Sequence, residues 1–417
     1  MRGLYTFNIY LFRLAVFIAG IFNKKARLWQ QGRKNLFEQL RANFKTESPV
    51  AWFHCASLGE FEQGRPLMEA FRKKHPDYKI ILTFFSPSGY AVRKNYPGAD
   101  YVCYLPLDTP SRAKRFLATV KPAVVFFIKY EFWYNFLYEL REQKIPHYLV
   151  SGIFRPSQPF FRSYGNWFRR ALHGYAHIFT QDENSLKLLK EIGIHRASIS
   201  GDTRFDRVAE IAANAKEIPL AKAFQNNRAV FIAGSTWPAD EEILYPLIAG
   251  QLSDEKNGIR KFMLVPHEIS ETHIENIIRS LEKNGGTKAV RFSQTTEAQA
   301  AEASVLIIDN IGMLSALYRY GTIGYIGGGF GAGIHNTLEA AVYGMPVFFG
   351  PNYRKFIEAR GLIAAGAAFS ISNAAELEQK FSKIAGNENV RLDCAARARF
   401  VSDHGGATAI ILAQLGK

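Results

Sequence analysis

The chain has 417 residues, which is too long for one ordinary hydrophobic core and predicts two domains. Hydrophobic residues make up 47% and charged residues 21%, which excludes a disordered or fibrous chain. The formal net charge of +15 indicates attraction to something anionic: nucleic acid, an acidic membrane leaflet or a phosphorylated ligand.

The first 22 residues read as a hydrophobic anchor. They carry only Arg2 and Arg13 and are rich in aromatic side chains, and the next 23 residues hold seven cations against one acid, Glu38. No Ala-x-Ala cleavage site follows, so a signal peptide is not favoured. Because the stretch is barely long enough to span a bilayer and Arg13 interrupts it, we expect a helix in the membrane interface rather than a clean span. The following positive charges then put the body of the protein in the cytoplasm, on the inner face of the membrane. The alternative is a core helix of the first domain.

Three cysteines, Cys55, Cys103 and Cys394, are scattered along the chain without metal-ligand spacing. They predict buried, reduced thiols in a reducing compartment.

From residue 50 onward, apolar runs alternate with amphipathic segments. This alternation predicts parallel sheets with crossover helices. The runs of the first half are 50–57, 79–85, 101–107, 123–129, 147–153 and 176–181, and those of the second are 229–235, 261–267, 288–293, 304–310, 322–328, 345–351 and 367–372.

The two sets of runs predict an α/β protein with two Rossmann-like domains facing each other across a cleft. The expected boundaries are an anchor helix at 1–22, a first domain at 23–210 and a linker at 211–228. A second domain follows at 229–388, and a last helix at 389–417 is free to cross back to the first domain.

The clearest local motif is a cluster of glycines after the expected strand 322–328. Its members are Gly327, Gly328, Gly329, Gly331 and Gly333, ahead of a helix expected to contain Asn336 and Glu339. Backbone amides there could approach a phosphate, and a carboxylate could accept hydrogen bonds from ribose hydroxyls. The alternative is a tight turn only. The spacing is neither GxGxxG nor GxxxxGK[ST], so neither a dinucleotide oxidoreductase nor a P-loop NTPase is indicated.

Two further polar positions end strands in the same half. Ser235 and Thr236 suit phosphate contacts or ordinary helix capping, and His267 suits a phosphate or base contact or a plain surface position.

The first half places carboxylates and a cation at strand ends. Glu60 follows the first strand, Glu131 follows the strand at 123–129, and Arg204 follows a further strand. Helix electrostatics alone accounts for an acid in a first helical turn. However, two carboxylates with a fixed cation also suit group transfer, with one acid as base and an arginine for a leaving phosphate.

The segment 151–181 holds four arginines, eight aromatic residues and no acid. This composition could bind nucleic acid by stacking, but beside a hydrophobic anchor a phosphate-bearing lipid fits better. We therefore expect no nucleic-acid partner and an anionic lipid of the inner membrane instead.

Five ordered motifs resemble the 3-deoxy-D-manno-octulosonic acid (Kdo) transferases of Gram-negative bacteria. The motifs are HCASLGE (54–60), YEFWYN (130–135), GDTRFD (201–206), AGSTWPADEE (233–242) and GGGFGAGIHNTLEAAVYGMPVFFGP (327–351). The resemblance implies a GT-B fold and an inverting, metal-independent glycosyltransferase that needs no cofactor. Such an enzyme moves Kdo from CMP-Kdo to a lipid A precursor (lipid IVA) at the cytoplasmic side of the inner membrane.

Carried over by motif, Glu60 is the general base, and Glu131 and Arg204 stabilise the transition state. The residues that the resemblance implies for holding CMP are Pro266, His267, Gly312, Met313, Leu314, Asn336, Thr337, Leu338 and Glu339, with Ser235 beside them.

The sequence departs from the family at some of these positions. The family usually has glutamate where Met313 stands, arginine where His267 stands and lysine where Arg204 stands. Two alternative functions remain open: another GT-B sugar-nucleotide enzyme such as a 2-epimerase, and a basic, membrane-attached nucleic-acid-binding protein.

Overall fold

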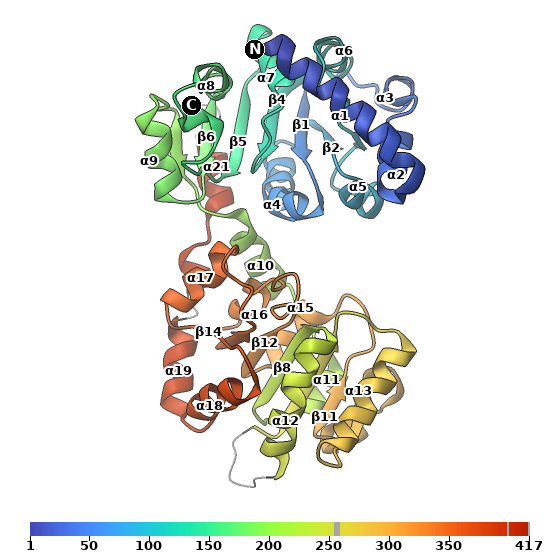
Figure 1. Cartoon of the computed structure of the whole chain (residues 1–417), viewed down its shortest axis with the longest axis vertical. Helices are drawn as coiled ribbons and strands as arrows, with labels where there is room; N and C mark the ends of the chain where they lie inside the picture. Colours follow the sequence, from blue (N-terminus) through green and yellow to red (C-terminus); the bar gives the residue numbers. More distant parts are fainter. Residues whose placement is uncertain (254–258, 398–399, 416–417) are drawn as a thin grey trace. The chain divides into compact units, whose positions relative to one another are not determined.

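The computed structural model describes residues 1–253, 259–397 and 400–415, which form two compact units. The first unit comprises residues 1–207 and the chain from residue 405 onward, and the second comprises Val208–His404 (Figure 1). The cleft expected between the units depends on their relative placement and stays a prediction.

The first unit is built on a seven-stranded parallel sheet with the order β3-β2-β1-β4-β5-β6-β7. The apolar runs expected from the sequence form its first six strands, and a short seventh strand precedes Arg204. The strands are β1 (Val50–Cys55), β2 (Lys79–Phe84), β3 (Tyr101–Tyr104), β4 (Pro122–Ile128), β5 (His147–Gly152), β6 (His177–Thr180) and β7 (Ala197–Ile199).

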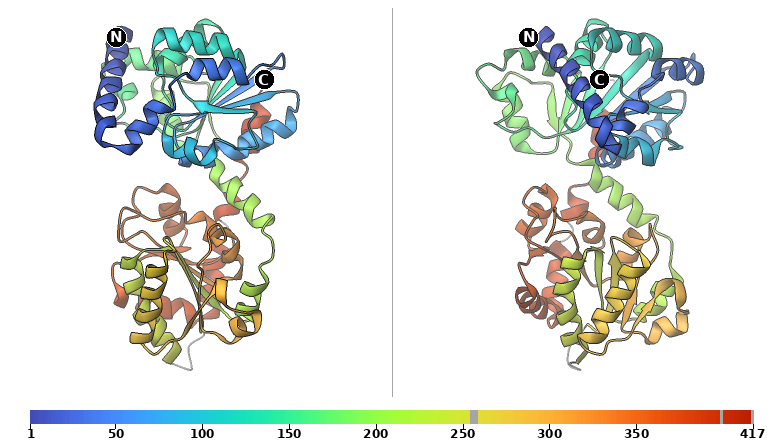
Figure 2. Two further views of the ribbon diagram at one scale, coloured as in Figure 1. Left: turned by 90° about the vertical axis from the view of Figure 1, so that its right-hand side faces the viewer. Right: turned by 45° about the vertical axis from the view of Figure 1, so that its right-hand side comes forward.

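Helices cover both faces of this sheet (Figure 2). They are α1 (Arg2–Phe22), α2 (Lys24–Gln31), α3 (Leu36–Asn43), α4 (Leu58–Lys74), α5 (Pro87–Arg93), α6 (Pro110–Val120), α7 (Tyr134–Glu142), η1 (Pro159–Phe161), α8 (Asn166–Leu172), α9 (Glu183–Glu191), the first part of α10 (Thr203–Ala213) and α21 (Ala407–Gln414).

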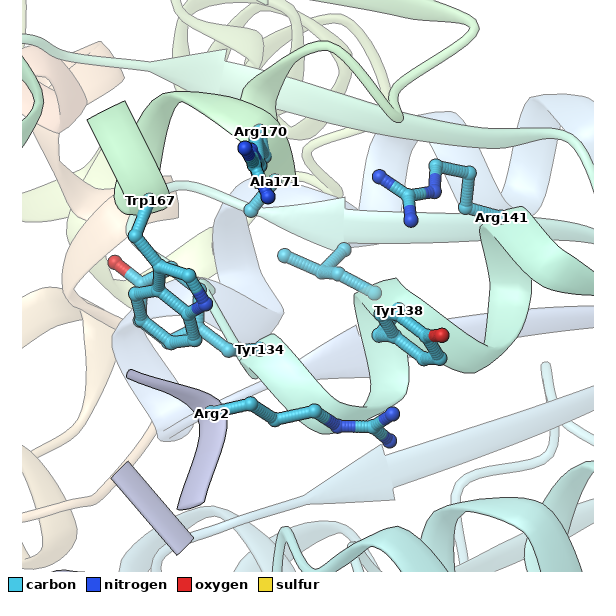
Figure 3. Close-up of a pocket in the computed structure, with 8 residues that line it drawn as sticks. Arg2, Tyr134, Tyr138, Arg141, Trp167, Arg170 and Ala171 are labelled. Atoms are coloured by element: carbon cyan, nitrogen blue, oxygen red, sulfur yellow. The ribbon is translucent and has the colours of Figure 1, made fainter. Parts of the chain in front are cut away.

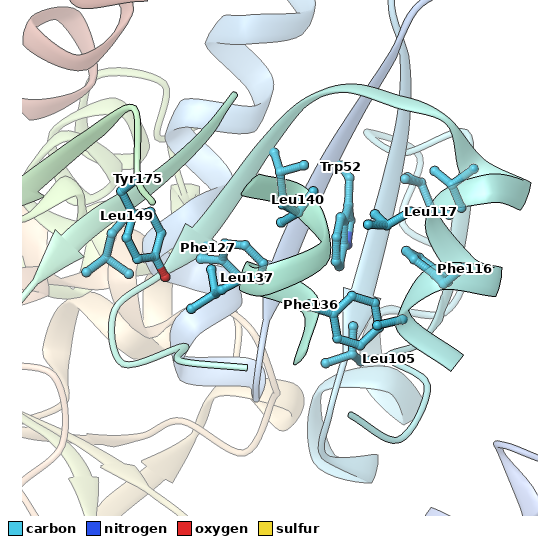
Figure 4. Close-up of a cluster of buried hydrophobic side chains, with 14 of the residues drawn as sticks. Trp52, Leu105, Phe116, Leu117, Phe127, Phe136, Leu137, Leu140, Leu149 and Tyr175 are labelled. Atoms are coloured by element: carbon cyan, nitrogen blue, oxygen red, sulfur yellow. The ribbon is translucent and has the colours of Figure 1, made fainter. Parts of the chain in front are cut away.

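One core of this unit centres on Trp52 of β1. Its ring packs against Phe116, Phe127 and Phe136, from α6, β4 and α7 (Figure 4). The indole N–H, which would be costly to bury without a partner, donates to Thr83 Oγ1 at 2.8 Å. Strand β1 is buried along its whole length, as expected for a central parallel strand.

The second unit repeats the architecture with the order β10-β11-β9-β8-β12-β13-β14, again all parallel. Each strand falls in one of the expected apolar runs. The strands are β8 (Val230–Thr236), β9 (Lys261–Pro266), β10 (Ala289–Arg291), β11 (Val305–Ile307), β12 (Ile323–Ile326), β13 (Val347–Phe349) and β14 (Ala368–Ser370).

The helices of the second unit follow the end of α10. They are α11 (Pro219–Gln225), α12 (Pro238–Ser253), α13 (Glu271–Lys283), η2 (Phe292–Gln294), α14 (Glu297–Glu302), α15 (Leu314–Leu317), η3 (Tyr318–Tyr320), α16 (Leu338–Ala341), α17 (Ile357–Ala364), α18 (Ala374–Ala385), α19 (Glu388–Arg397) and α20 (Phe400–Asp403).

The structure differs from the sequence-based boundaries at the expected linker. The units divide after Arg207, and the stretch 211–228 folds as part of the second unit. The reason is that Ala221 and Phe224, three positions apart on α11, give that helix a buried apolar face.

The single last helix expected at 389–417 is instead interrupted, because α20 ends at Asp403 and α21 begins at Ala407 after Gly406 (φ 94°). Helix α21 packs against α4 of the first unit, where Leu412 O accepts a hydrogen bond from Lys74 Nζ at 3.0 Å. The Asp206 carboxylate also accepts from the backbone amides of Gly406 and Thr408.

Helix α1 is long and apolar enough to cross a membrane by length and composition. In the structure one side of it is docked on the first unit: Tyr5 Oη donates to Asp108 at 2.6 Å, and Gln30 of α2 donates to Val16 O at 2.7 Å. The opposite side exposes a stripe of apolar residues spaced three and four apart: Leu4, Phe7, Leu11, Leu14, Ile18 and Ile21.

Candidate functional site

The candidate site of the first unit lies where the strand order reverses, between β1 and β4. In open parallel sheets this switch point, at the carboxyl ends of the strands, is where ligands bind. Glu60 follows β1 and Glu131 follows β4, so the two predicted carboxylates flank the switch point.

Glu60 sits in the first turn of α4, as helix electrostatics favours. Ser57 occupies the N-cap position but makes no side-chain bond to the helix backbone; its hydroxyl donates to the Glu60 carboxylate instead. Glu60 is half-buried, whereas Glu62 pairs with Arg93 at 2.7 Å on the neighbouring α5. The two acids therefore have different partners, a hydroxyl for Glu60 and an arginine for Glu62.

Glu131 is buried, with 6% of its surface exposed, and is held by two donors. Trp133 Nε1–H points at Glu131 Oε2 at 2.5 Å, and His54 Nε2 lies 3.0 Å from the same oxygen. Tyr175 Oη donates to the Glu131 backbone carbonyl at 3.0 Å. A buried carboxylate with this many partners is fixed in position.

His54 lies between Thr83 and Glu131. Its Nδ1 is 2.8 Å from Thr83 Oγ1, and its Nε2 is 3.0 Å from Glu131 Oε2 and 2.9 Å from Trp133 Nε1. His54, Trp133 and Glu131 therefore form one buried polar cluster. The sequence offered no role for His54 beyond its place in the motif HCASLGE.

Arg204 stands at the start of α10 with its guanidinium paired to Asp202. Nε and Nη2 reach Asp202 Oδ2 at 2.8 and 2.6 Å, and Asp202 Oδ1 accepts from Gln63 Nε2 at 2.8 Å. Gln63 belongs to α4, the helix that carries Glu60. Arg204 is thus oriented by Asp202, which Gln63 holds in turn. Gln63 lies one helical turn after Glu60, the predicted base.

The three predicted residues lie at one edge of the sheet. Glu60 and Glu131 stand after β1 and β4, and Arg204 is tied to the same edge through Asp202 and Gln63 of α4, the helix that carries Glu60. Burial raises the pKa of the Cys55 thiol well above its usual value, and the charges of Glu60 and Glu131 raise it further.

The second unit has its own switch point, between β8 and β12, where Ser235 and the glycine segment emerge. Asp240, which is buried, holds this point together. Its carboxylate accepts from Tyr325 Oη at 2.8 Å, from the Gly328 amide at 2.8 Å and from the Trp237 amide at 3.0 Å. Ser235 has a left-handed backbone (φ 55°) at a register shift of β8.

The glycines allow backbone segments to pass close to one another, a role that the sequence did not predict. A side chain on Gly327 would meet the backbone of Ser235 at 2.1 Å, and one on Gly329 would meet Gly350 at 2.5 Å. The amides of Gly331 and Gly333 both donate to Gly328 O. The Gly327 amide donates to Gly234 O and the Gly328 amide to Asp240. The prediction that these amides face a phosphate is therefore wrong for Gly327, Gly328, Gly331 and Gly333, whose N–H groups are already used within the unit.

His267 forms the middle of a three-ring stack. Its ring centroid lies 4.5 Å from Trp237 and 4.6 Å from His335, with interplanar angles of 24° and 29°. Trp237 Nε1 donates to His335 Nε2 at 3.1 Å, and burial lowers the pKa of His335, with the neighbouring His267 lowering it further. Pro266 ends the buried strand β9 directly before this stack.

The remaining predicted nucleotide contacts gather around Glu339. Asn336 precedes α16 rather than lying inside it, and its Nδ2 donates to Glu339 Oε1 at 2.9 Å. Burial raises the pKa of Tyr318, with Glu339 raising it further. Helix α16, which carries Glu339, contacts η3, and η3 follows Gly312, Met313 and Leu314 after one short helix, α15. Thr337 and Leu338 are buried, and Thr337 Oγ1 is a buried hydroxyl without a hydrogen-bond partner in the part of the chain that the structure describes.

Metal ligands do not gather at either switch point. Across residues 1–253, 259–397 and 400–415, no group of three His, Cys, Asp or Glu side chains is placed to hold a metal ion.

Two Rossmann-like units with acidic and glycine-rich switch points define a GT-B-type α/β enzyme, and solved structures share this fold. A UDP-GlcNAc 2-epimerase from Neisseria meningitidis aligns with a TM-score of 0.58 at 15% identity, covering 88% of this chain and 99% of the other. A calicheamicin glycosyltransferase aligns with a TM-score of 0.56 at 12% identity, covering 89% and 99%.

Sequence comparison narrows the class to one family. The 3-deoxy-D-manno-octulosonic-acid transferase (kdotransferase) family matches residues 30–207, which is nearly the whole first unit. A 3-deoxy-D-manno-octulosonic acid transferase of Aquifex aeolicus is 29% identical over 84% of this chain and 91% of its own length. These matches indicate a glycosyltransferase that is similar to the Kdo transferases.

Proposed function

We propose that the protein transfers Kdo from CMP-Kdo to a lipid A precursor with inversion at the anomeric carbon and without a metal ion. The observation that carries the proposal is that Glu60 follows β1 and Glu131 follows β4, on the two sides of the switch point in the unit that matches the Kdo transferase family. The lipid acceptor and the donor are those that the family resemblance implies.

The geometry suits one displacement. Glu60, half-buried and able to shed its Ser57 hydrogen bond, takes the proton of the acceptor hydroxyl as that oxygen bonds to the anomeric carbon. The bond from that carbon to the CMP phosphate breaks on the opposite face, and CMP leaves with the electron pair. Glu131, fixed by His54 and Trp133, offers negative charge to the cationic sugar, and Arg204 offers positive charge to the departing phosphate.

The second unit supplies a fitting nucleotide site. Exposed His267, whose two faces are covered by Trp237 and His335, offers the edge of its ring, and Glu339, held by Asn336, offers a carboxylate for ribose hydroxyls. Ser235 and the Gly312–Leu314 segment complete the proposed CMP contacts. His267 stands where the family usually has an arginine, so a hydrogen bond from its ring edge to the phosphate or base is its expected contribution.

Membrane attachment fits helix α1. Because the helix is docked along one side and apolar on the other, we infer that it lies in the interface of the inner membrane on the cytoplasmic side. The first unit would then meet its lipid acceptor at the membrane surface.

The decisive experiment incubates the purified full chain with CMP-Kdo, generated in situ, and a tetraacylated lipid A precursor, with product masses read directly. Glu60→Gln should lower transfer by about 10²- to 10⁴-fold, the usual contribution of a general base, while CMP binding stays intact. Glu62→Gln is the matched control, because Glu62 pairs with Arg93 and has no role in the step. Near-normal turnover by Glu60→Gln would refute the base assignment, and turnover of UDP-GlcNAc without acceptor would favour a 2-epimerase.

Transfer should also persist in EDTA. CMP leaves as a phosphate monoester, so cationic side chains such as Arg204 can meet the developing charge without a divalent ion. The same mass assay, run with EDTA and then with added magnesium, checks this. Complete loss of product that magnesium restores would count against the metal-independent step.

A further inference from the structure

A cavity beneath the middle of α1 is lined by four cations and by no acid. Its volume is about 380 Å³, and Arg13, Arg33, Lys34 and Arg112 converge on it from α1, the α2–α3 turn and α6. Such a concentration of one sign of charge is costly unless an anion neutralises it.

Arg33 is held rigidly, and within the described residues its bonded partners are neutral. Its guanidinium donates to the carbonyls of Trp29, Leu105 and Phe85 at 2.9 to 3.1 Å and lies 3.9 Å from the Trp29 ring centroid. These contacts use three of its N–H groups without cancelling its charge. Burial, with nearby Arg112 acting in the same direction, lowers the pKa of Arg33 to about 9.

Arg112 of α6 and Arg13 of α1 line the same cavity as like charges. Burial lowers the pKa of Arg112 from its usual value, and Arg13 is the next cause in the same direction. Guanidinium groups bind phosphate oxygens through their paired N–H donors.

A second arginine-lined cavity nearby is arranged differently. It lies at the N-terminal end of α1, where Arg2 lies over the Tyr138 ring and Arg141 and Arg170 line the other sides (Figure 3). There, Arg2 pairs with Glu139 at 2.8 Å and Arg141 pairs with Glu142 at 3.0 Å. Its charges are partly neutralised by the protein itself, which makes it a natural control.

The position of the four-cation cavity indicates the source of the anion. Phe17 lines the cavity, and the exposed stripe of α1 runs beside it, with Leu14 and Ile18 each more than half exposed. A ligand there meets positive charge on one side and an apolar surface on the other. That combination matches the headgroup and acyl boundary of an anionic lipid.

We propose that the cavity of Arg13, Arg33, Lys34 and Arg112 binds the phosphate of an anionic lipid headgroup at the membrane surface. The inference rests on the membrane attachment in the proposed function but not on sugar transfer. A binding assay can therefore fail while transfer stands, and the reverse.

The test measures binding of the full chain to three kinds of vesicle made in digalactosyldiacylglycerol, a neutral lipid without phosphate. One kind is undoped, one carries phosphatidylglycerol, and one carries an equal fraction of a diacylglycerol hemisuccinate with a carboxylate charge. The variants are Arg112→Gln, Arg13→Gln as a second variant on the exposed helix, and Arg141→Gln as the charge-matched control from the other cavity.

The expected result is a selective loss. On phosphatidylglycerol vesicles, Arg112→Gln and Arg13→Gln should each weaken binding by well over the roughly fivefold cost of one charge near an anionic membrane. Arg141→Gln should stay within that cost, and on carboxylate vesicles all three variants should lose equally. Unchanged circular dichroism and unfolding temperature check that each variant folds.

Two results would overturn the proposal. Equal losses for Arg112→Gln and Arg141→Gln on phosphatidylglycerol would reduce the cavity to general surface charge. If inorganic phosphate alone stabilises the wild type but not Arg112→Gln, and phosphatidylglycerol vesicles give no selectivity, the cavity takes a free anion and the lipid assignment is wrong.

Discussion

At the scale of single residues, His54 is the position that the structure adds to the candidate site. Its ring is fully buried between Thr83 and Glu131, and its Nε2 lies 3.0 Å from the Glu131 carboxylate. His54 does not reach substrate by itself; it positions Glu131. A histidine at the end of a buried strand is usually a core residue, so the sequence alone offered only its place in the motif HCASLGE.

We expect His54→Leu to lower kcat for transfer about tenfold to a hundredfold. Removing one hydrogen bond to a buried charged group costs ~1.5–3 kcal/mol. We expect this cost to raise the free energy of the transition state that Glu131 is proposed to stabilise. His54→Gln, whose amide can still donate, should recover part of the loss. KM for CMP-Kdo should stay unchanged because the nucleotide residues lie in the second unit. A rise in KM with unaltered kcat would show that His54 serves packing rather than Glu131.

At the scale of elements, α1 is fastened to the helix that follows Glu131. Asp108 accepts from Tyr5 Oη, from the Asn135 amide at 3.2 Å and from the Phe136 amide at 3.0 Å, and Arg2 donates to Asn135 Oδ1 at 2.8 Å. The anchor helix and the start of α7 therefore share one buried carboxylate. Any tilt of α1 away from the domain would leave Asp108 with fewer donors.

Tyr5→Phe should destabilise the first unit by ~1–3 kcal/mol at neutral pH, the cost of removing one partner of a buried acceptor. Burial raises the pKa of Asp108 to about 6, with the Tyr5 hydrogen bond acting against that shift. The folded state therefore takes up a proton at Asp108 near pH 6, whereas the unfolded state does so only near its ordinary value of 3.8. Protonated Asp108 needs the donor less, so the cost of Tyr5→Phe should shrink as the pH falls through about 6.

Urea unfolding of wild type and Tyr5→Phe at several pH values measures this difference. Tyr10→Phe on the exposed side of α1 is the control and should be neutral throughout. A cost that is constant from pH 7 to pH 4 would mean that the Asp108 carboxylate does not depend on Tyr5.

The sequence predicted elements better than contacts. Strands were predictable because buried parallel strands are continuous apolar runs, and strand ends could be placed because the crossover pattern is regular. The pairing of Arg204 with Asp202 and Gln63 was not, since Gln63 and Asp202 are separated by 139 positions and no local pattern joins them. The role of the glycine segment was predicted wrongly for a related reason. The backbone of Ser235 lies next to Gly327 in the fold but is far from it in the sequence.

At the scale of the whole molecule, part of the excess positive charge lies beside the proposed membrane contact. The four-cation cavity and the apolar stripe of α1 lie on the same unit, the one that matches the Kdo transferase family over residues 30–207. The unit with the proposed base thus also carries the proposed membrane contact. An acceptor embedded in a bilayer can be reached this way without leaving the lipid phase.

Membrane attachment should be lost when the exposed stripe of α1 is made polar. Deleting residues 1–22 would remove attachment but would also leave Asp108 without Tyr5, so a cleaner change is Leu14→Glu with Ile18→Glu on the outward side. Withdrawing two such side chains from a lipid interface costs at least ~3 kcal/mol, which predicts a loss of vesicle binding of about a hundredfold or more.

The control is Leu392→Glu, at an equally exposed apolar position on α19 of the second unit, and this variant should bind as wild type does. Co-sedimentation with vesicles of inner-membrane composition measures both, with unfolding curves as a check on the fold; undiminished binding of the double variant would move the contact from α1 to the arginine- and aromatic-rich segment 151–181.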